Sequence, residues 1–391
     1  MEVFVAGGGI AGLTAAIAMA TAGHRVMVAE RAGELREIGA ALSLWPNACA
    51  ALDFLGVGDE VRAIGLEAPT ASVLSTSGKP IVRFDTEAMR RSLGGLPLIV
   101  LRAGLQTALL RECGQLGVEI CLGETVEGVR PDGPRVAVTT SRRRAVFDAV
   151  VGADGINSRV GTAIRSDDGV RDCDRIVWRA LIPAGLAPVS ETWLTVGVGL
   201  QLIASPAPEE LVYWAADTPG RDMPADSTSD HQDFLRRRFG AWHAPIPAMI
   251  DATAPDALIV NRIFDRRPPR ALHNGPILLV GDAAHAMTPD LGQGACQAIE
   301  DAAVLLACAR ARPTTDPAGL FEWFETIRGG RVRRLVRDSH ALGRLAVSRS
   351  RPGAGARDFL TRLLPESMHN RRLASYSSAD AFGRQLIQAG S

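Results

Sequence analysis

Residues 281–303, GDAAHAMTPDLGQGACQAIEDAA, are the stretch around which the chain is organised. The run 276–280 before them, PILLV, is continuously apolar, as a buried strand is. Prolines and glycines keep the next turn irregular, and apolar positions on one face predict a helix from Ala295 to Leu306. A strand, an acid, a glycine-rich turn and a helix start indicate a site where backbone N–H groups converge on a ligand. The alternative is an ordinary strand-to-helix connection.

A second glycine-rich turn lies near the start of the chain. A short apolar strand from Glu2 to Ala6 leads into residues 7–12, GGGIAG, which fit the pattern G-x-G-x-x-G. A helix of small and apolar residues is expected from Leu13 to Ala22, and a second strand from Arg25 to Ala29 ends at Glu30. That acid follows the last glycine of the pattern by 18 positions, close to the spacing of about 20 in dinucleotide-binding folds.

Each group in this turn has a physical role. Gly7 allows the tight turn, Gly9 lets the backbone approach a pyrophosphate, and Gly12 lets helix and strand pack closely. The helix N-terminus attracts the phosphate charge, and Glu30 accepts hydrogen bonds from ribose hydroxyls. The sequence therefore predicts a bound adenine dinucleotide, but this motif alone does not distinguish FAD from NAD.

A third motif follows a buried strand predicted from Phe147 to Ala153. It reads GADGINSR over residues 152–159, and Ser158 is placed to cap the next short helix. Earlier in the chain, Arg102 opens a helix expected from Ala103 to Cys113. The simpler interpretation of that arginine is a salt bridge at a helix start.

These motifs together resemble the FAD-dependent aromatic hydroxylases, the class A single-component flavoprotein monooxygenases, over residues 1 to about 345. GDAAHAMTPDLGQGACQAIEDA is similar to the second flavin motif of that family and GADGINSRV to its third. The chain looks nearest to the urate hydroxylase and salicylate hydroxylase-like branch. The resemblance implies FAD as cofactor and NADH or NADPH as a transient co-substrate. It also implies O2-dependent hydroxylation of an aromatic or heteroaromatic small molecule through a flavin C4a-hydroperoxide.

The resemblance also assigns residues to the cofactor. Asp282, an acceptor-only group, is expected at the ribityl chain, and Val126 on the adenine side. The backbone from Gly292 to Ala295 is expected to face the isoalloxazine ring. The complete expected FAD set is Gly7, Gly9, Ala11, Gly12, Glu30, Arg31, Ser43, Arg102, Val126, Asp154, Asp282, Pro289, Gly292, Gln293, Gly294 and Ala295.

The substrate is expected to bind among polar side chains of an otherwise apolar pocket. The catalytic candidates are Arg179, Gln201 and Tyr213 on predicted strands, with Pro289 in the turn beside the flavin. The substrate-binding candidates are Trp45, Arg179, Gln201, Tyr213 and Gln297. For Trp45 the alternative is a packing residue. For Gln201 and Tyr213 the alternative is a solvated or core-edge position on a strand.

One position bears on substrate charge. In the urate hydroxylase branch an arginine on a pocket strand grips urate, and a tyrosine follows on the next strand. Aligned on Ser205-Pro206, the arginine becomes Gln201 here, while Tyr213 keeps the tyrosine. A neutral amide does not supply a guanidinium fork for an anion. Urate itself is therefore not expected to be the main substrate, and a less anionic ring is.

The expected fold class is α/β: a Rossmann-like FAD-binding domain, a second substrate domain with a mostly antiparallel β-sheet, and C-terminal helices. Weak alternation over 70–100 predicts antiparallel strands, turns are expected at Pro206 and Pro208, and residues 356–374 are predicted to be helical. The expected FAD-binding domain comprises residues 1–70, 97–165 and 271–345. The expected substrate domain comprises 71–96 and 166–270, and 346–391 form a C-terminal helical segment.

Composition limits the possible partners. The 43 basic and 43 acidic residues give a formal net charge of zero, so neither nucleic acid nor an anionic membrane surface is expected as a partner. The six cysteines show no C-x-x-C pair and no metal spacing, which favours a cytoplasmic protein without a metal site. No apolar run of about 18 residues predicts a membrane span. A monomer or homodimer is expected.

Two other functions remain open from the sequence. One is a flavin-dependent epoxidase or dehydrogenase acting on a larger hydrophobic molecule. The other belongs to a different class, a flavin-binding protein that holds a ligand without turnover. Stimulation of NAD(P)H oxidation by an aromatic compound distinguishes the hydroxylase from both.

Overall fold

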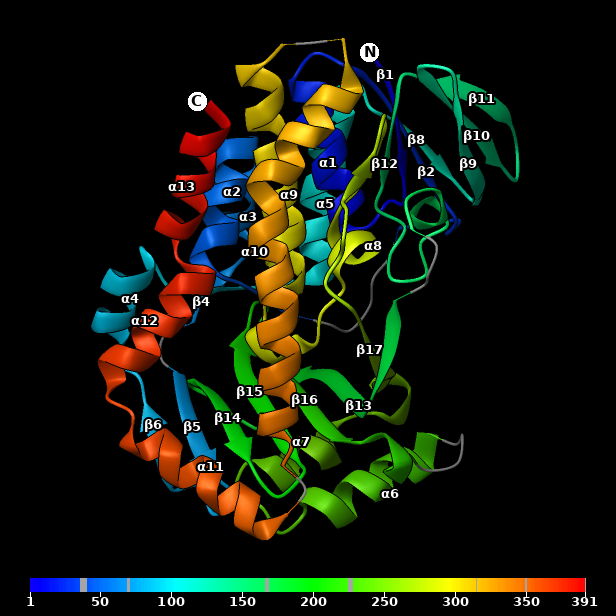
Figure 1. Ribbon diagram of the computed structural model, residues 1–391. Coiled ribbons are helices and arrows are strands. Elements are labelled where there is room, and N and C mark those ends of the chain that lie inside the picture. The colour runs from blue at the N-terminus through cyan, green and yellow to red at the C-terminus, as the bar shows by residue number, and fades with distance from the viewer. Residues whose placement is uncertain are drawn as a thin grey trace.

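The computed structural model of this protein describes residues 1–35, 41–68, 71–165, 169–223, 228–313, 315–348 and 350–390. The expected domain boundaries at residues 70 and 166 lie outside these ranges. Residues 37–40, the start of the loop after the second predicted strand, also lie outside them. The expected fold class is confirmed: one mostly parallel sheet carries the glycine-rich motifs, and a larger, mostly antiparallel sheet lies beside it (Figure 1).

The first sheet has six strands in the order β18-β19-β12-β1-β2-β8. All neighbours in it are parallel except the edge pair β18–β19. Its strands are β1 (Glu2–Ala6), β2 (Arg25–Glu30), β8 (Glu119–Leu122), β12 (Ala149–Gly152), β18 (His273–Asn274) and β19 (Ile277–Leu279). Helices α1 (Ile10–Thr21), α5 (Arg102–Gln115) and α9 (Gly294–Ala311) stand together beside the sheet (Figure 1). Strands and helices share one apolar core, as parallel sheets require.

The second sheet has seven strands in the order β17-β13-β16-β15-β14-β5-β6, and only the β14–β5 pair is parallel. Strands from residues 71–83 thus pair with strands from after residue 169. The strands are β5 (Ala71–Ser75), β6 (Pro80–Arg83), β13 (Val170–Pro183), β14 (Thr192–Val196), β15 (Gln201–Ala207), β16 (Leu211–Pro219) and β17 (Ile259–Arg266). Because these two segments share one sheet, we propose the domain division that the sequence predicts.

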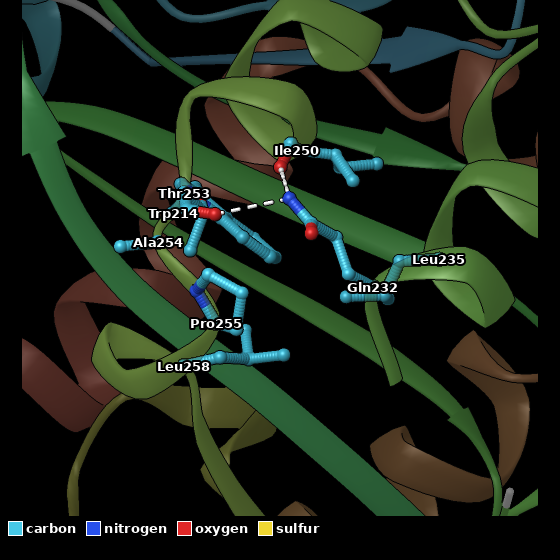
Figure 2. A pocket seen from close by; sticks show the side chains of 8 residues that line it. All are labelled: Trp214, Gln232, Leu235, Ile250, Thr253, Ala254, Pro255 and Leu258. Carbon is cyan, nitrogen blue, oxygen red and sulfur yellow. Dashed lines mark hydrogen bonds between the residues drawn. The ribbon is translucent and has the colours of Figure 1, made fainter. Parts of the chain in front are cut away.

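One face of the second sheet is closed by helices α6 (Thr228–Phe239) and α7 (Ile246–Ala252), which cover Trp178 and Trp214. Figure 2 shows a small pocket there, in which Gln232 of α6 donates through Nε2 to the carbonyl oxygens of Ile250 and Thr253, both at 3.0 Å. No water-sized group fits in this pocket. Because side chains alternate along a strand, Tyr213 points to the opposite face from Trp214, toward the FAD-binding part.

The remaining smaller elements lie between these strands and helices along the chain, and they include two three-stranded sheets, β11-β10-β9 and β3-β7-β4. They are β3 (Ala41–Leu44), β4 (Leu66–Glu67), β7 (Leu98–Leu101), β9 (Val126–Asp132), β10 (Arg135–Thr140), β11 (Arg144–Phe147), α2 (Pro46–Leu55), α3 (Gly58–Ala63), α4 (Thr86–Leu93), η1 (Val160–Ala163), η2 (Gly220–Asp222) and η3 (Pro255–Ala257). Two expectations need correction. Residues 86–93 form a helix, because Asp85 caps it by accepting from the N–H of Ala88 at 2.6 Å. Pro206 lies inside β15, not at a turn.

The C-terminal part is helical, as expected, but more extensively. The long helix α10 (Pro317–Ala346) runs from the FAD-binding part past the second sheet, followed by α11 (Arg351–Leu363), α12 (Glu366–Ser377) and α13 (Ala379–Gly390) (Figure 1). The last helix lies within the expected C-terminal helical segment 346–391, although beyond the helix predicted at 356–374, and it packs against α2 and α9. Among the described residues, no helix combines the length and apolar character needed to cross a membrane.

Candidate flavin and substrate site

The first glycine turn leaves one side of its backbone open. Gly7 has φ +102°, and a Cβ there would lie 2.5 Å from the carbonyl oxygen of Ala153. A Cβ at Gly12 would overlap the carbonyl oxygen of Gly7, so this glycine is required for close packing. At Gly9, in contrast, a Cβ would meet no atom within 4 Å. The turn is therefore tight on the protein side and accessible at Gly9, where the N-terminus of α1 begins.

Glu30 at the end of β2 holds this turn in place. Its carboxylate accepts from the backbone N–H of Gly8 at 2.6 Å and of Ala32 at 2.9 Å. Arg31 beside it is exposed. Gln106 of α5 donates to the carbonyl oxygen of Gly8 at 3.4 Å. Glu30 thus lies beside the loop that the sequence assigns to phosphate, at the position expected of a ribose contact.

The first and second motifs touch each other. Gly281 has φ +55°, and a Cβ on it would lie 2.7 Å from Cβ of Ala11. This close approach lets α1 pack along α9. Residues 281–285 form a short helix, α8, and residues 289–291 a turn of 3-10 helix, η4, where the sequence predicted an irregular turn. The N-termini of α1 and α9 therefore lie in one continuous region, although their first residues, Ile10 and Gly294, are 284 positions apart in the sequence.

Asp282 lies in this region, with its side chain exposed. Enough protein surrounds the carboxyl group that burial raises its pKa, while His285 and Arg102 oppose the shift. For Arg102, burial and then the neighbouring Arg179 lower the pKa, and Asp282 raises it. Arg179 belongs to the second sheet, and Leu181 and Tyr213 on the same face pack in one cluster with Leu101, the residue before Arg102. That face of the sheet therefore lies close to the start of α5.

The start of α9 is bare and faces an indole. Gly292 is in the left-handed region at φ +62°, and a Cβ on it would lie 2.9 Å from Nε1 of Trp45. Within the described part of the chain this buried Nε1 has no hydrogen-bond partner. At Gly294 a Cβ would meet nothing within 4 Å, and Pro289 is exposed. Free N–H groups at a helix start and an unpaired indole N–H suit an electron-rich ligand.

Three expected cofactor residues have protein partners of their own. Asp154 accepts from the backbone N–H of Arg159 at 2.6 Å and from the hydroxyl of Ser158. The N-cap position of η1 is Arg159 rather than the expected Ser158, although Ser158 Oγ accepts from the N–H of Gly161 in the first turn. Val126 is buried in the core. Ser43 on β3 is half-buried, and its carbonyl oxygen accepts from the thiol of Cys296. Their contacts with FAD stay predictions.

Gln297 was expected to contact substrate, and we do not retain that expectation. Its side chain is fully buried and donates to Gln293 Oε1 at 2.8 Å and to Glu300 Oε1 at 3.1 Å. The Gln293 side chain is equally buried and donates to Ser377 at 3.0 Å. Both side chains point into the helix packing, so only the backbone of Gln293 is a candidate for flavin contact.

The second sheet supplies a wall opposite this region. Arg179 on β13 and Tyr213 on β16 share one face, since Arg179 pairs with Ala215 and Tyr213 lies two residues away. Gln201 on β15 lies on the same face, opposite Asp217. Burial raises the pKa of Tyr213 and Arg179 opposes the shift. The structure therefore brings the three polar strand residues to the same face.

The ion pairs beside this wall were not expected from the sequence. Arg175 of β13 bridges Asp217 of β16 and Asp290 of η4, joining the sheet to the second motif. The only signal that could have pointed to them was the position of Asp290 directly after Pro289.

A recess of about 570 Å³ lies between β13 and the end of α10, and Arg175 is one of the residues that line it. Near it, Cys173, Asp265 and His340 form a group of potential metal ligands in the described part of the chain. Asp265 already accepts from Arg171 at 2.7 and 2.8 Å and from His340 at 2.8 Å. Because the guanidinium neutralises this carboxylate, we assign no metal to the group.

These features fit FAD. The open backbone at Gly9 and the start of α1 suit a pyrophosphate, and the accessible Asp282 suits a polyol hydroxyl. The bare start of α9 suits the ring oxygens and nitrogens of a flavin.

Comparison with known proteins agrees. Residues 1–183 and 261–338 match the family model described as FAD binding domain. The chain belongs to the FAD-dependent aromatic hydroxylase family. This family member is 33% identical over 370 residues to the aurachin C monooxygenase/isomerase of Stigmatella aurantiaca, covering 93% of this chain and 94% of the relative. It is 33% identical over 345 residues to a FAD-dependent urate hydroxylase of Klebsiella pneumoniae, covering 86% and 88%.

A solved structure gives the same result. Klebsiella pneumoniae HpxO complexed with FAD and uric acid has a TM-score of 0.87 and 28% identity, covering 96% of both chains. The hydroxylase is thus an FAD-dependent monooxygenase, an oxidoreductase of aromatic or heteroaromatic substrates.

Asp282 offers a direct test of the cofactor assignment. Asp282→Ala should weaken FAD binding by about 1.5–3 kcal/mol, because a charged acceptor is lost from the site. Fluorescence titration of the apoprotein with FAD measures this. Asp256→Ala, at an exposed position on η3, is the matched control and should leave the affinity unchanged. Equal affinities in both variants would remove Asp282 from the site.

Proposed function

We propose that this hydroxylase uses NADH or NADPH and O2 to hydroxylate a ring that is less anionic than urate. The observation that carries the proposal is that Tyr213 and Leu181 of the second sheet pack in one cluster with Leu101, which directly precedes Arg102. Bound FAD supplies the redox chemistry, taking electrons from the nicotinamide and activating O2. The protein supplies position, polarity and shielding from water.

The wall residues have distinct roles in this proposal. Leu181, Ile203 and Ala215 are half-buried apolar residues on the face of Tyr213 and form the surface on which a ring lies. Tyr213 donates a hydrogen bond to an oxygen of the substrate. Arg179, which donates to Asn261 on β17, adds positive charge on the same face as Tyr213. Trp45 beside Gly292 closes the flavin side with a free indole N–H.

Substrate charge follows from Gln201. It lies on the wall at the position where the urate hydroxylase branch is expected to have its arginine, and its amide is hydrogen-bonded to Asp217. A neutral amide beside a carboxylate does not favour an anion. We therefore propose that urate is a poor substrate, and efficient urate turnover by the parent protein would overturn this.

A substrate screen tests the proposed function. Purified holoprotein is mixed with NADH or NADPH, and oxidation is followed with a broad panel of phenols, aminobenzoates, quinolones and purines. At least one ring should accelerate oxidation and give a hydroxylated product by mass spectrometry. If no member of the panel accelerates oxidation, the hydroxylase proposal fails in favour of a binding protein without turnover.

The two tyrosines of the chain give a matched pair of variants. Tyr213→Phe should lower kcat/KM about tenfold, because one hydrogen bond to the substrate is lost. Tyr376→Phe removes a hydroxyl that donates to Asp338 at 2.7 Å on the C-terminal helices, so kcat/KM should stay within twofold. An unchanged kcat/KM in Tyr213→Phe would place this residue outside the site.

Three further expectations stay proposals. We propose a cytoplasmic location, on the free state of the six cysteines. We propose a monomer or homodimer, which sedimentation velocity measures. We propose Pro289, exposed in η4, as a residue of the catalytic turn that contacts the flavin.

A further inference from the structure

A buried chain of charged groups lies next to Gln201. Arg175 donates through NH1 to Asp290 at 2.7 Å and through Nε to Asp217 at 3.0 Å. The side chains of Arg175, Asp290 and Asp217 are 3%, 2% and 6% exposed, so water competes little for these bonds. Gly343 of α10 adjoins them, and a Cβ on it would collide with Asp290 and Arg175. Asp217 is therefore held by a guanidinium that is itself anchored to a second buried carboxylate.

Asp217 fixes the orientation of the Gln201 amide. The amide nitrogen Nε2 donates to Asp217 Oδ2 at 3.1 Å. An ionised carboxylate only accepts hydrogen bonds, so the nitrogen and not the oxygen of the amide faces it. Burial raises the pKa of Asp217, and the Arg175 guanidinium only partly opposes that shift. The carboxylate nevertheless acts as an acceptor here, because Arg175 Nε donates to Oδ2 at 3.0 Å and Gln201 Nε2 donates to the same oxygen at 3.1 Å. Oε1 of Gln201 consequently lies on the other side, and it accepts no hydrogen bond from any residue in the described ranges.

The wall thus has two ends of different polarity. The acceptor Oε1 lies at the Gln201–Asp217 pair, and Tyr213 lies four residues along β16 from Asp217, about 13 Å at 3.3 Å per residue. Tyr213 and Arg179 provide donors at that second end. The apolar Ile203 and Ala215 lie between the ends. A ring with polar groups on two opposite edges suits a wall that has an acceptor at one end, donors at the other and apolar side chains between them.

On this basis, and resting on the proposed function, we infer that Gln201 presents its amide oxygen to the substrate. The substrate then carries an N–H or O–H donor on the edge that meets Gln201, and an oxygen acceptor on the edge that meets Tyr213. A ring with only acceptors on the first edge would leave Gln201 Oε1 unpaired and repelled. The specificity of the site is therefore for a neutral donor-bearing ring, and Asp217 and Arg175 are positioning residues for it.

Isosteric ligand pairs test this polarity. 4(1H)-Quinolone has a ring N–H where chromone has a ring oxygen, and indole and benzofuran differ in the same way. The two members of each pair have nearly the same size. Each is titrated into the holoprotein, and the absorbance change of the bound flavin gives Kd. The donor member of a pair should bind at least about tenfold more tightly, because a site built around a hydrogen bond rejects the analogue that lacks it.

Three variants locate the origin of the preference. Gln201→Met removes the acceptor and keeps a side chain of similar length. Asp217→Asn allows the amide group of Gln201 to flip, so that its oxygen and nitrogen exchange places, because an asparagine both donates and accepts hydrogen bonds. In both, the preference should fall below threefold. Gln115→Met, the same substitution at an exposed position at the end of α5, is the matched control: it leaves the wall unchanged, so the preference should persist.

The outcomes separate this inference from the proposed function. Equal binding within pairs by the parent, no binding of any donor member, or a full preference in Gln201→Met would each overturn the inference. If the parent protein hydroxylates rings that lack N–H and O–H groups, the proposed function stands and the inference is wrong. If it prefers donor members but oxidises no NAD(P)H with any ring, the inferred polarity stands and the proposed function is wrong.

Discussion

Gly9→Val is expected to give a folded protein without FAD. No atom lies within 4 Å of a Cβ at this position, and φ of −75° is accessible to valine, so the fold accepts the side chain. The branched side chain would occupy the space through which a pyrophosphate approaches the backbone and the start of α1. We expect loss of FAD binding by at least about a hundredfold, with an unchanged unfolding temperature of the apoprotein. Visible absorbance and circular dichroism measure the two.

Gly12→Val is the matched comparison. A Cβ there overlaps the carbonyl oxygen of Gly7, so this variant should lose the fold as well as the cofactor. Together the two glycines separate a role in ligand approach from a role in packing. A folded Gly9→Val protein that remains fully yellow would show that phosphate does not bind at this turn.

Arg328→Ala should cause the largest loss of stability, about 3–5 kcal/mol, because it leaves buried carboxylates without their partner. Arg328 is 0% exposed and donates to Asp301 at 2.8 Å and to Glu300 at 2.6 Å. It also donates to Gln385 of α13 at 2.7 Å, so the substitution would remove one of the hydrogen bonds that join the last helix to this cluster. Urea unfolding of the apoprotein measures the change in the free energy of unfolding.

The same substitution should also disturb the start of α8 in the second flavin motif. Asp301 accepts from the backbone N–H of Gly281 at 2.9 Å and from His285 at 2.7 Å, so it positions the start of α8. Arg328→Ala should therefore also weaken FAD binding. Arg337→Ala, exposed on the same helix, is the control and should change stability by less than about 0.5 kcal/mol. A loss below about 1 kcal/mol in Arg328→Ala would contradict the assigned role.

The pH dependence of stability gives an independent check. Burial would raise the pKa of Glu300, but Arg331 and Arg328 outweigh it and hold the pKa well below its usual range. A carboxylate whose folded pKa is depressed stabilises the protein above its unfolded pKa, about 4.3 for glutamate. The parent should lose this stability as the pH falls through that value and below. Arg328→Ala should show a shallower loss.

The glycine turns could be predicted from sequence because each depends on neighbouring residues. Gly7, Gly9 and Gly12 lie between a strand and a helix, and the close approach of Gly12 to the carbonyl oxygen of Gly7 involves only this turn, although Ala153 also limits the space at Gly7. Ser158 is likewise local, because its Oγ accepts from the N–H of Gly161, three residues away. Elements with strong periodicity, such as β1 and α9, were likewise found, with ends shifted by a few residues.

Weaker local signals led to errors. Helix α4 was missed because residues 86–93 are mostly polar, with only Met89 and Leu93 buried, and its start depends on one capping aspartate, Asp85. Pro206 lies within β15, a strand position where composition alone favours a turn. Gln297 was assigned to the substrate because it follows the flavin motif, but its place on the buried face of α9 turns it toward Arg328.

By itself the sequence determined the family, the cofactor class and the glycines that admit it, because these are contiguous patterns with fixed backbone requirements. Only the tertiary structure decided which polar side chains share the wall, because strand pairing places Gln201, Tyr213 and Arg179 on one face. It also decided that the Gln201 amide has one orientation. That depends on Arg175 meeting Asp217 and Asp290 in a buried place, where an unpaired charge is costly and a paired one fixes its neighbours.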